Sequence, residues 1–151
     1  MGIGKDIHQL KFRNVYQKAV VNLIYTANWM REKSTGILDA EEITPQQFNI
    51  LRILRGSHPK PLSTLQIRER MLDKMSDTSR IVDRLITKGL VKKYTCKADR
   101  RLVDVTISDK GLKLLERLDK KQDEMDAVLD NLTEKEATEL SNLLDKIRDK
   151  E

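Results

Sequence analysis

The chain has 151 residues, of which 38% are hydrophobic and 35% charged, and its formal net charge at pH 7 is +5. This length fits one compact subunit that buries a core, and the charged fraction is typical of a helical protein with long solvated faces. The sequence lacks a run of about 18 apolar residues and the apolar core of a secretory signal, so we expect a cytoplasmic protein without a membrane span.

The residues that carry most enzyme and metal chemistry are few. With one cysteine, Cys96, and two histidines, His8 and His58, the sequence excludes an intramolecular disulfide and predicts no zinc site. Lysines flank Cys96 and favour its thiolate, although a lone cysteine is more often a packing residue. Because a phosphate-binding glycine loop and a convincing catalytic set are also missing, we expect neither an enzyme nor a cofactor.

Charge is distributed unevenly along the chain. Residues 52–101 contain 14 basic and 5 acidic side chains, whereas residues 104–151 contain 9 basic and 14 acidic ones. A basic central segment between less basic ends is expected if that segment faces nucleic acid. A basic face that is merely solvated is the alternative, so the charge gains weight only if the fold directs these residues outward together.

The first predicted element is one long helix over about residues 7–33. Apolar residues recur there at helical spacing, and Ser34, Thr35 and Gly36 are expected to end the helix. Apolar residues also lie outside the main stripe, so more than one face should be buried. A second subunit would cover these faces, although a monomer that packs its terminal helices on its own core is the alternative.

Three shorter helices are predicted next. Thr44 is placed to cap the first, with Pro45 at its first position and Gln47 completing a capping box, and Ser63 caps the second. Asp73 is expected to cap the third, whose inward stripe comprises Met75, Thr78, Val82, Leu85 and Ile86. Two short helices with a tight connection, the second with a polar outer face, are typical of a helix-turn-helix.

A hairpin and two helices complete the chain. Residues 90–96 and 102–107 are rich in β-forming side chains and predict two strands joined by a turn, which together form a wing. Ser108 is expected to cap a long, partly exposed helix that reaches about Leu132. Thr133 and Glu136 then form another capping box, which opens a final helix. The predicted fold is therefore mainly α with a small β-wing, a winged helix-turn-helix with helical extensions.

Three stretches, TPQQFNILRIL, SDTSRIVDRLITKGLVKK and DRRLVDVTISDKG, resemble the MarR family of bacterial transcription regulators. The resemblance covers nearly the whole chain, and Ile107 and Ser108 stand where the family often has Leu-Thr. It implies an N-terminal dimerisation helix over residues 1–33, a winged helix-turn-helix over residues 44–107 and C-terminal dimerisation helices over residues 108–151, all in one compact subunit.

The resemblance also implies which side chains touch DNA. Arg80 and Arg84 share one face of the helix that would enter the major groove, and Arg100 and Arg101 at the wing tip would enter the minor groove. An acid at Asp77 would repel phosphate unless it accepts a cytosine amine or orients one of the helix arginines. The complete predicted set is Ser76, Asp77, Ser79, Arg80, Arg84, Lys92, Lys93, Lys97, Asp99, Arg100 and Arg101. The alternatives are solvated surface residues and, for Asp99, a brace that only stabilises the hairpin.

The implied function is sequence-specific binding of double-stranded DNA by a homodimer, which acts as a repressor on a palindromic operator and is released by a small-molecule effector. Non-specific architectural DNA binding is the alternative. An effector pocket would be lined by Tyr16, Tyr25, Trp29 and Phe48, for each of which core packing is the competing explanation. Redox sensing through Cys96 is disfavoured. The relatives that sense oxidants resemble one another in carrying a reactive cysteine in the first helix, and this chain has none there.

Overall fold

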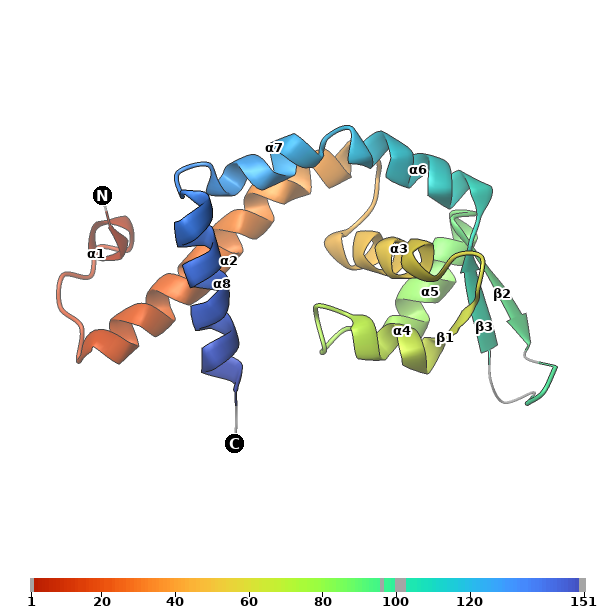
Figure 1. The fold of residues 1–151 in the computed structure, drawn as a ribbon, viewed down its shortest axis with the longest axis horizontal. Helices are drawn as coiled ribbons and strands as arrows, with labels where there is room; N and C mark the ends of the chain where they lie inside the picture. Colours follow the sequence, from red (N-terminus) through yellow and green to blue (C-terminus); the bar gives the residue numbers. More distant parts are fainter. Residues whose placement is uncertain (1, 96, 100–102, 150–151) are drawn as a thin grey trace. The chain divides into compact units, whose positions relative to one another are not determined.

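A computed structural model describes residues 2–95, 97–99 and 103–149 and divides the chain into two compact units (Figure 1). Residues 1–33 and 122–151 form one unit, and residues 34–121 form the other. The helices are α1 (Ile3–Asp6), α2 (Val15–Asp39), α3 (Pro45–Ser57), α4 (Thr64–Arg70), α5 (Thr78–Thr87), α6 (Asp109–Asp119), α7 (Gln122–Asp126) and α8 (Glu134–Arg148), with one 3₁₀ turn, η1 (Ala127–Leu129). The strands are β1 (Leu62–Ser63), β2 (Val91–Thr95) and β3 (Val103–Ile107). The predicted fold class, mainly α with a small β-wing, is confirmed.

Side-chain caps start four of the helices at the predicted residues. The Thr44 hydroxyl accepts a hydrogen bond from the backbone amide of Gln47 at 3.1 Å, and the Gln47 side chain accepts one from the amide of Thr44 at 3.0 Å. Ser63 and Thr133 form equivalent capping boxes at α4 and α8. At α6, the Ser108 hydroxyl accepts from the amide of Gly111 at 3.1 Å. Each cap satisfies an amide that the first turn of a helix leaves without a backbone acceptor.

The long helix α2 lies further along the chain than the predicted range of residues 7–33. Asn14 marks its start, where the side-chain oxygen accepts a hydrogen bond from the amide of Gln17 at 2.9 Å. The helix then continues through Gly36 to Asp39. Leu38 in its last turn is only 3% exposed, so burial of this side chain outweighs the low helix propensity of Gly36.

The start of α5 also differs from the prediction, because Asp77 rather than Asp73 caps this helix. The Asp77 carboxylate accepts from the amide of Arg80 at 3.2 Å, whereas Asp73 accepts from the amide of Met75 at 3.0 Å within the preceding turn. Met75 therefore precedes the helix, and its side chain is 93% exposed instead of buried.

The sheet has the order β1–β3–β2, and both pairings are antiparallel. Strands β2 and β3 form the predicted wing, in a register that pairs Val91 with Ile107. Strand β1, which was not predicted, pairs Leu62 with Val105. Helices α3, α4 and α5 contact this sheet or one another (Figure 1). The fully buried side chains between these elements and α6 are Ile50, Leu51, Leu54, Ile67, Val82, Leu85, Val105, Leu115 and Leu118.

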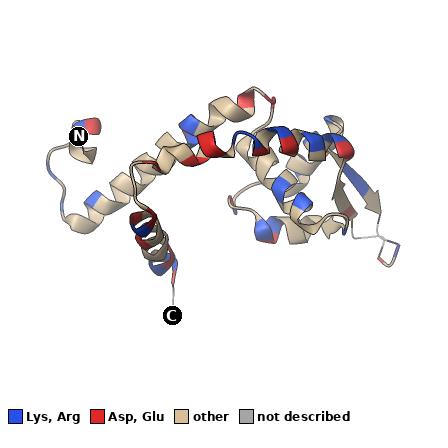
Figure 2. Cartoon of the chain, turned by 45° about the horizontal axis from the view of Figure 1, so that its top comes forward, with Lys and Arg blue, Asp and Glu red and all other residues tan. Residues whose placement is uncertain are grey.

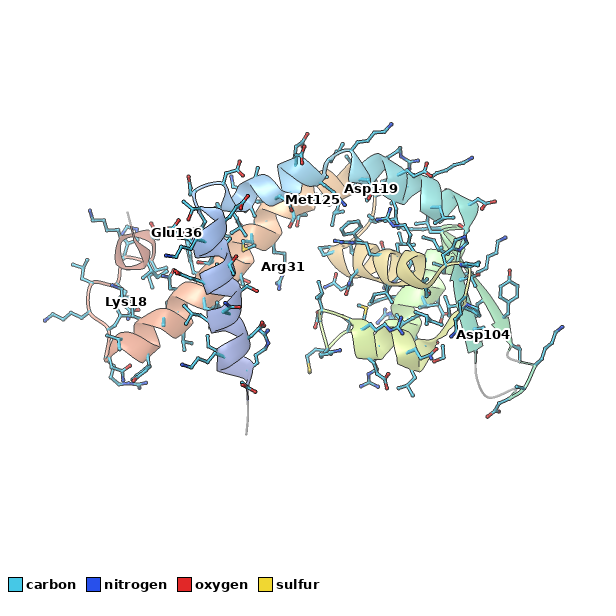
Figure 3. All side chains as sticks on the ribbon, in the orientation of Figure 1. Lys18, Arg31, Asp104, Asp119, Met125 and Glu136 are labelled. Atoms are coloured by element: carbon cyan, nitrogen blue, oxygen red, sulfur yellow. The ribbon has the colours of Figure 1, made fainter. Side chains whose placement is uncertain are left out.

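The predicted helix from Ser108 to about Leu132 is divided into α6, α7 and η1. Leu118 is the last buried residue of α6, and the polar residues 119–124 include no buried side chain that would hold a continuous helix against a core. Two bidentate ion pairs fasten the end of α6. Arg55 contacts Asp119 at 2.7 and 3.0 Å, and Arg117 contacts Glu41 at 2.8 Å; Figure 3 labels Asp119 on α6.

Candidate nucleic-acid interface

Helix α5 has one buried face and one exposed face. Thr78, Val82 and Leu85 recur at helical spacing and are 4%, 1% and 0% exposed, which fixes the helix against α3 and α4. The positions between them direct their side chains to solvent: Ser79, Arg80, Asp83 and Arg84. Because the burial of one stripe sets the rotation of the helix, the polar face predicted from the sequence is the exposed one.

Arg80 and Arg84 are one helical turn apart on this exposed face. In the described part of the chain, neither guanidinium forms an ion pair, so both charges are available to an external anion. Figure 2 marks basic positions in blue on the helices and on the wing of the unit of residues 34–121. A guanidinium binds the O6 and N7 acceptors of guanine or a phosphate through paired N–H donors. The two arginines can therefore serve base and backbone contacts from one helix.

A cavity of about 400 Å³ lies beside the first turn of α5. Asp77 and Ser79 line it together with Ser76 and Thr78, and helix α4 contributes Thr64, Leu65 and Arg68. The hydroxyl groups of Ser76 and Thr78 are buried and have no hydrogen-bond partner among the described residues. The structure thus gathers three of the predicted residues, Ser76, Asp77 and Ser79, around one polar hollow.

Arg68 and Thr64 were not identified from the sequence. They are four residues apart on α4 and face the same cavity as the start of α5. The helical period of α4 would have placed the two residues on one face, but only the packing of α4 beside α5 turns that face toward the predicted interface.

The wing carries a second group of basic residues. Lys92 and Lys93 on β2 and Lys97 beyond it are exposed, and the Lys93 ammonium lies 3.3 Å from the Asp83 carboxylate of α5. This ion pair joins the wing to the helix. Tyr94, on the same strand, is 52% exposed and was not predicted as a contact. Asp99 is half-buried, whereas Arg100, Arg101 and Cys96 lie outside the described residues.

The four aromatic residues predicted to line an effector pocket do not lie in one unit. Tyr16, Tyr25 and Trp29 are on the part of α2 that belongs to the unit of residues 1–33 and 122–151, and all three are exposed. Tyr25 and Trp29 are one turn apart on one face of the helix, and Tyr16 is on the opposite face. Phe48 is on α3, where its ring faces the Arg52 guanidinium at 5.6 Å.

Neither a metal-binding group of side chains nor a membrane-spanning helix occurs among the described residues. Across residues 2–95, 97–99 and 103–149, histidine, cysteine, aspartate and glutamate do not form a group of three or more that could hold a metal ion. No helix in this described portion is both long and apolar enough to cross a bilayer.

Comparisons with known proteins agree with this arrangement. The sequence model of the MarR family matches residues 43–103. The HTH-type transcriptional repressor MdtR of Bacillus subtilis is 31% identical over 73% of this chain and 70% of its own length. The crystal structure of a MarR transcription factor from Planctomyces limnophilus is 34% identical, covers 89% of this chain and 98% of that one, and superposes with a TM-score of 0.68. The fold also matches that of a mutant MarR from E. coli complexed with operator DNA, with a TM-score of 0.75 at 24% identity over 83% of this chain and 89% of that one.

Proposed function

The chain belongs to the MarR family of DNA-binding transcription regulators, and from this premise we propose that it is a homodimeric repressor that reads a palindromic operator and is released by a small-molecule effector. Members of the family are regulators and not enzymes. MdtR of Bacillus subtilis is named as a repressor, and the mutant MarR of E. coli was solved in complex with operator DNA.

The exposed face of α5 is the observation that carries the proposal. Arg80 and Arg84 stand on it without an intramolecular ion pair among the described residues, while the opposite stripe is buried and fixes the orientation of the helix. In the proposed complex these side chains contact base edges and phosphates in the major groove. Lys92, Lys93 and Lys97 contact the backbone, and Arg100 and Arg101 enter the minor groove.

Uncovered apolar surface supports the homodimer. On α2, the exposed large apolar and aromatic side chains range from Trp29 at 39% exposure to Tyr16 at 79%, and α8 has no buried residue. Surface of this kind usually marks a protein contact, and a twofold dimer matches a twofold operator. The side chains available to this contact are Val15, Tyr16, Val20, Leu23, Ile24, Leu140, Leu143 and Ile147.

The proposed effector site keeps the aromatic residues predicted from the sequence, which are Tyr16, Tyr25, Trp29 and Phe48. Aromatic rings of this kind bind small aromatic molecules, and the hydroxyl and indole N–H groups can orient them. Core or interface packing remains the competing role, and it predicts that variants such as Trp29→Ala change stability without changing release from DNA.

Selection of bound fragments from a randomised duplex pool tests the main proposal. We expect a palindromic sequence with two half-sites about one helical turn apart. On that sequence Arg80→Ala or Arg84→Ala should weaken binding about 5- to 100-fold and reduce the slope of affinity against salt by about one ion. Lys113→Ala, which removes an exposed charge from α6, is the control and should change binding little.

Two results would contradict the proposal. The absence of any enriched sequence, with affinity equal to that for competitor DNA, would instead support a non-specific architectural protein. Equal losses for Arg84→Ala and Lys113→Ala would mean that general charge, and not the face of α5, carries the binding.

A further inference from the structure

Two exposed carboxylates, that of the N-cap Asp77 and that of Asp83, lie at the start and on the exposed face of α5, which the proposed function turns toward a polyanion. Asp83 is neutralised within the protein, because the Lys93 ammonium lies 3.3 Å from its carboxylate. Asp77 has no such partner: no basic side chain of the described residues forms an ion pair with it. An uncompensated negative charge at Asp77 weakens the attraction of α5 to DNA phosphates. This cost in affinity suggests that the carboxylate has a specific role.

Capping alone accounts for only one carboxylate oxygen of Asp77. Oδ1 accepts the hydrogen bond from the backbone amide of Arg80, and Oδ2 has no hydrogen-bond partner within the described chain. The contact with Arg80 is made through the backbone, so the structure does not support the alternative that Asp77 orients a guanidinium. Serine or asparagine would cap the helix equally well without a charge.

The surroundings of Asp77 are open and polar. It lines the cavity of about 400 Å³ beside the first turn of α5, together with Arg68 and Ser79. Thr78, which is 4% exposed, lines the same cavity, and its hydroxyl has no hydrogen-bond partner among the described residues. A polar group of a bound molecule can therefore reach the Asp77 carboxylate through this cavity.

The major groove offers a carboxylate few donors. The exocyclic amines of cytosine and adenine are the hydrogen-bond donors on base edges there, and guanine and thymine present acceptors that repel an acid. Adenine also places its N7 acceptor beside the amine, whereas cytosine has a C–H at the corresponding position. A carboxylate at the start of a helix in this groove thus favours cytosine over the other three bases.

We propose that Asp77 is a specificity-determining residue, whose free carboxylate oxygen accepts a hydrogen bond from the N4 amine of one cytosine in each operator half-site. This inference rests on the proposed function, since it requires that α5 enters the major groove. In this role the Asp77 carboxylate lowers the general affinity for DNA and increases the difference in affinity between the C·G pair and the other base pairs at one position.

The variant Asp77→Asn tests this role because asparagine preserves the cap and removes the charge. Asp73→Asn is the matched control: it removes the same charge four residues earlier, and asparagine can also accept the hydrogen bond from the amide of Met75. Wild type and both variants are each subjected to selection from a randomised duplex pool. Affinities are then measured on the selected duplex and on duplexes changed at single base pairs.

For wild type we expect about five- to tenfold weaker binding when the contacted C·G pair is replaced. Asp77→Asn should lose this preference or shift it to adenine, to which an asparagine amide can both donate and accept. Both variants should bind competitor DNA more tightly by similar factors, because each removes one negative charge. Asp73→Asn should keep the wild-type base preference.

The possible outcomes distinguish a failure of this inference from a failure of the proposed function. If wild type enriches a sequence and Asp77→Asn enriches the same one with an unchanged preference at every position, Asp77 is only a cap and the inference is wrong. If wild type enriches no sequence, the operator-reading function fails and the inference fails with it. A thermal midpoint of Asp77→Asn equal to that of wild type confirms that the changed preference does not come from a lost helix.

Discussion

At Gly111 the first turn of α6 passes close to the wing. A Cβ at this position would lie 2.4 Å from the backbone oxygen of Leu90 and 2.7 Å from Cγ1 of Ile107. Because a backbone carbonyl cannot move aside cheaply, Gly111→Ala should lower the free energy of unfolding by about 2–3 kcal/mol. Gly36, also helical, has no atom within 4 Å of its would-be Cβ, so Gly36→Ala should raise stability by about 0.5–1 kcal/mol. Urea denaturation of both variants measures this difference, and equal effects would contradict it.

Residue-level features were predictable where the signal is local. The caps at Thr44, Ser63, Ser108 and Thr133 follow from short side chains whose partners are three residues away, and all four were found. The choice between Asp73 and Asp77 was not predictable, because both can cap and the outcome depends on which start places Thr78, Val82 and Leu85 against the core.

At the scale of elements, the Glu41–Arg117 ion pair joins the turn after α2 to α6. The hydrogen bond from Arg117 lowers the pKa of Glu41 below its ordinary value of 4.5. The unfolded chain then takes up a proton more readily than the folded one, so this contribution to stability is complete above that value and disappears as the pH falls through the folded pKa. Arg117→Gln should therefore show a smaller loss of stability between pH 7 and pH 4 than wild type does.

Denaturation midpoints at both pH values measure this effect. Arg148→Gln, which removes an exposed pair with Asp145 within α8, is the control and should retain the pH dependence of wild type. Identical pH dependence in all three proteins would show that the Glu41–Arg117 pair does not contribute to acid sensitivity.

Elements whose limits depend on distant contacts were the ones predicted incorrectly. Helix α2 extends past Gly36 because Leu38 is buried, and β1 exists only because Leu62 pairs with Val105, far along the sequence. A strand of two residues has no periodicity of its own. The exposure of Arg80 and Arg84 could be predicted because the buried stripe of α5 is strongly periodic. The burial of the Ser76 hydroxyl, which was expected to face outward, and the part played by α4 in the cavity depend on packing between elements.

At the scale of the whole molecule, the proposed dimer leads to a prediction about α8. Leu143 and Ile147 are one turn apart and are 59% and 67% exposed. Leu143→Glu would place an unpaired charge in the proposed interface, so the dimer dissociation constant should rise about a hundredfold or more, and operator affinity should fall with it. Asn142→Glu adds the same charge at the neighbouring exposed position and is the control. Sedimentation at micromolar concentration distinguishes the species, and a monomeric wild type would contradict the dimer.

The boundary between the two units falls at Lys33–Ser34, inside α2, and at Lys121–Gln122, between α6 and α7. The first junction lies within a helix and is not an exposed loop tip of the kind at which domain insertion succeeds most often. If recombination between relatives exchanged the unit that we propose reads DNA, it would have to rejoin helix α2 with its residues in the correct helical phase at the first junction. We therefore expect the DNA sequence that such a protein recognises to change through point substitutions on the exposed face of α5. Exchange of whole units between relatives is expected to contribute less.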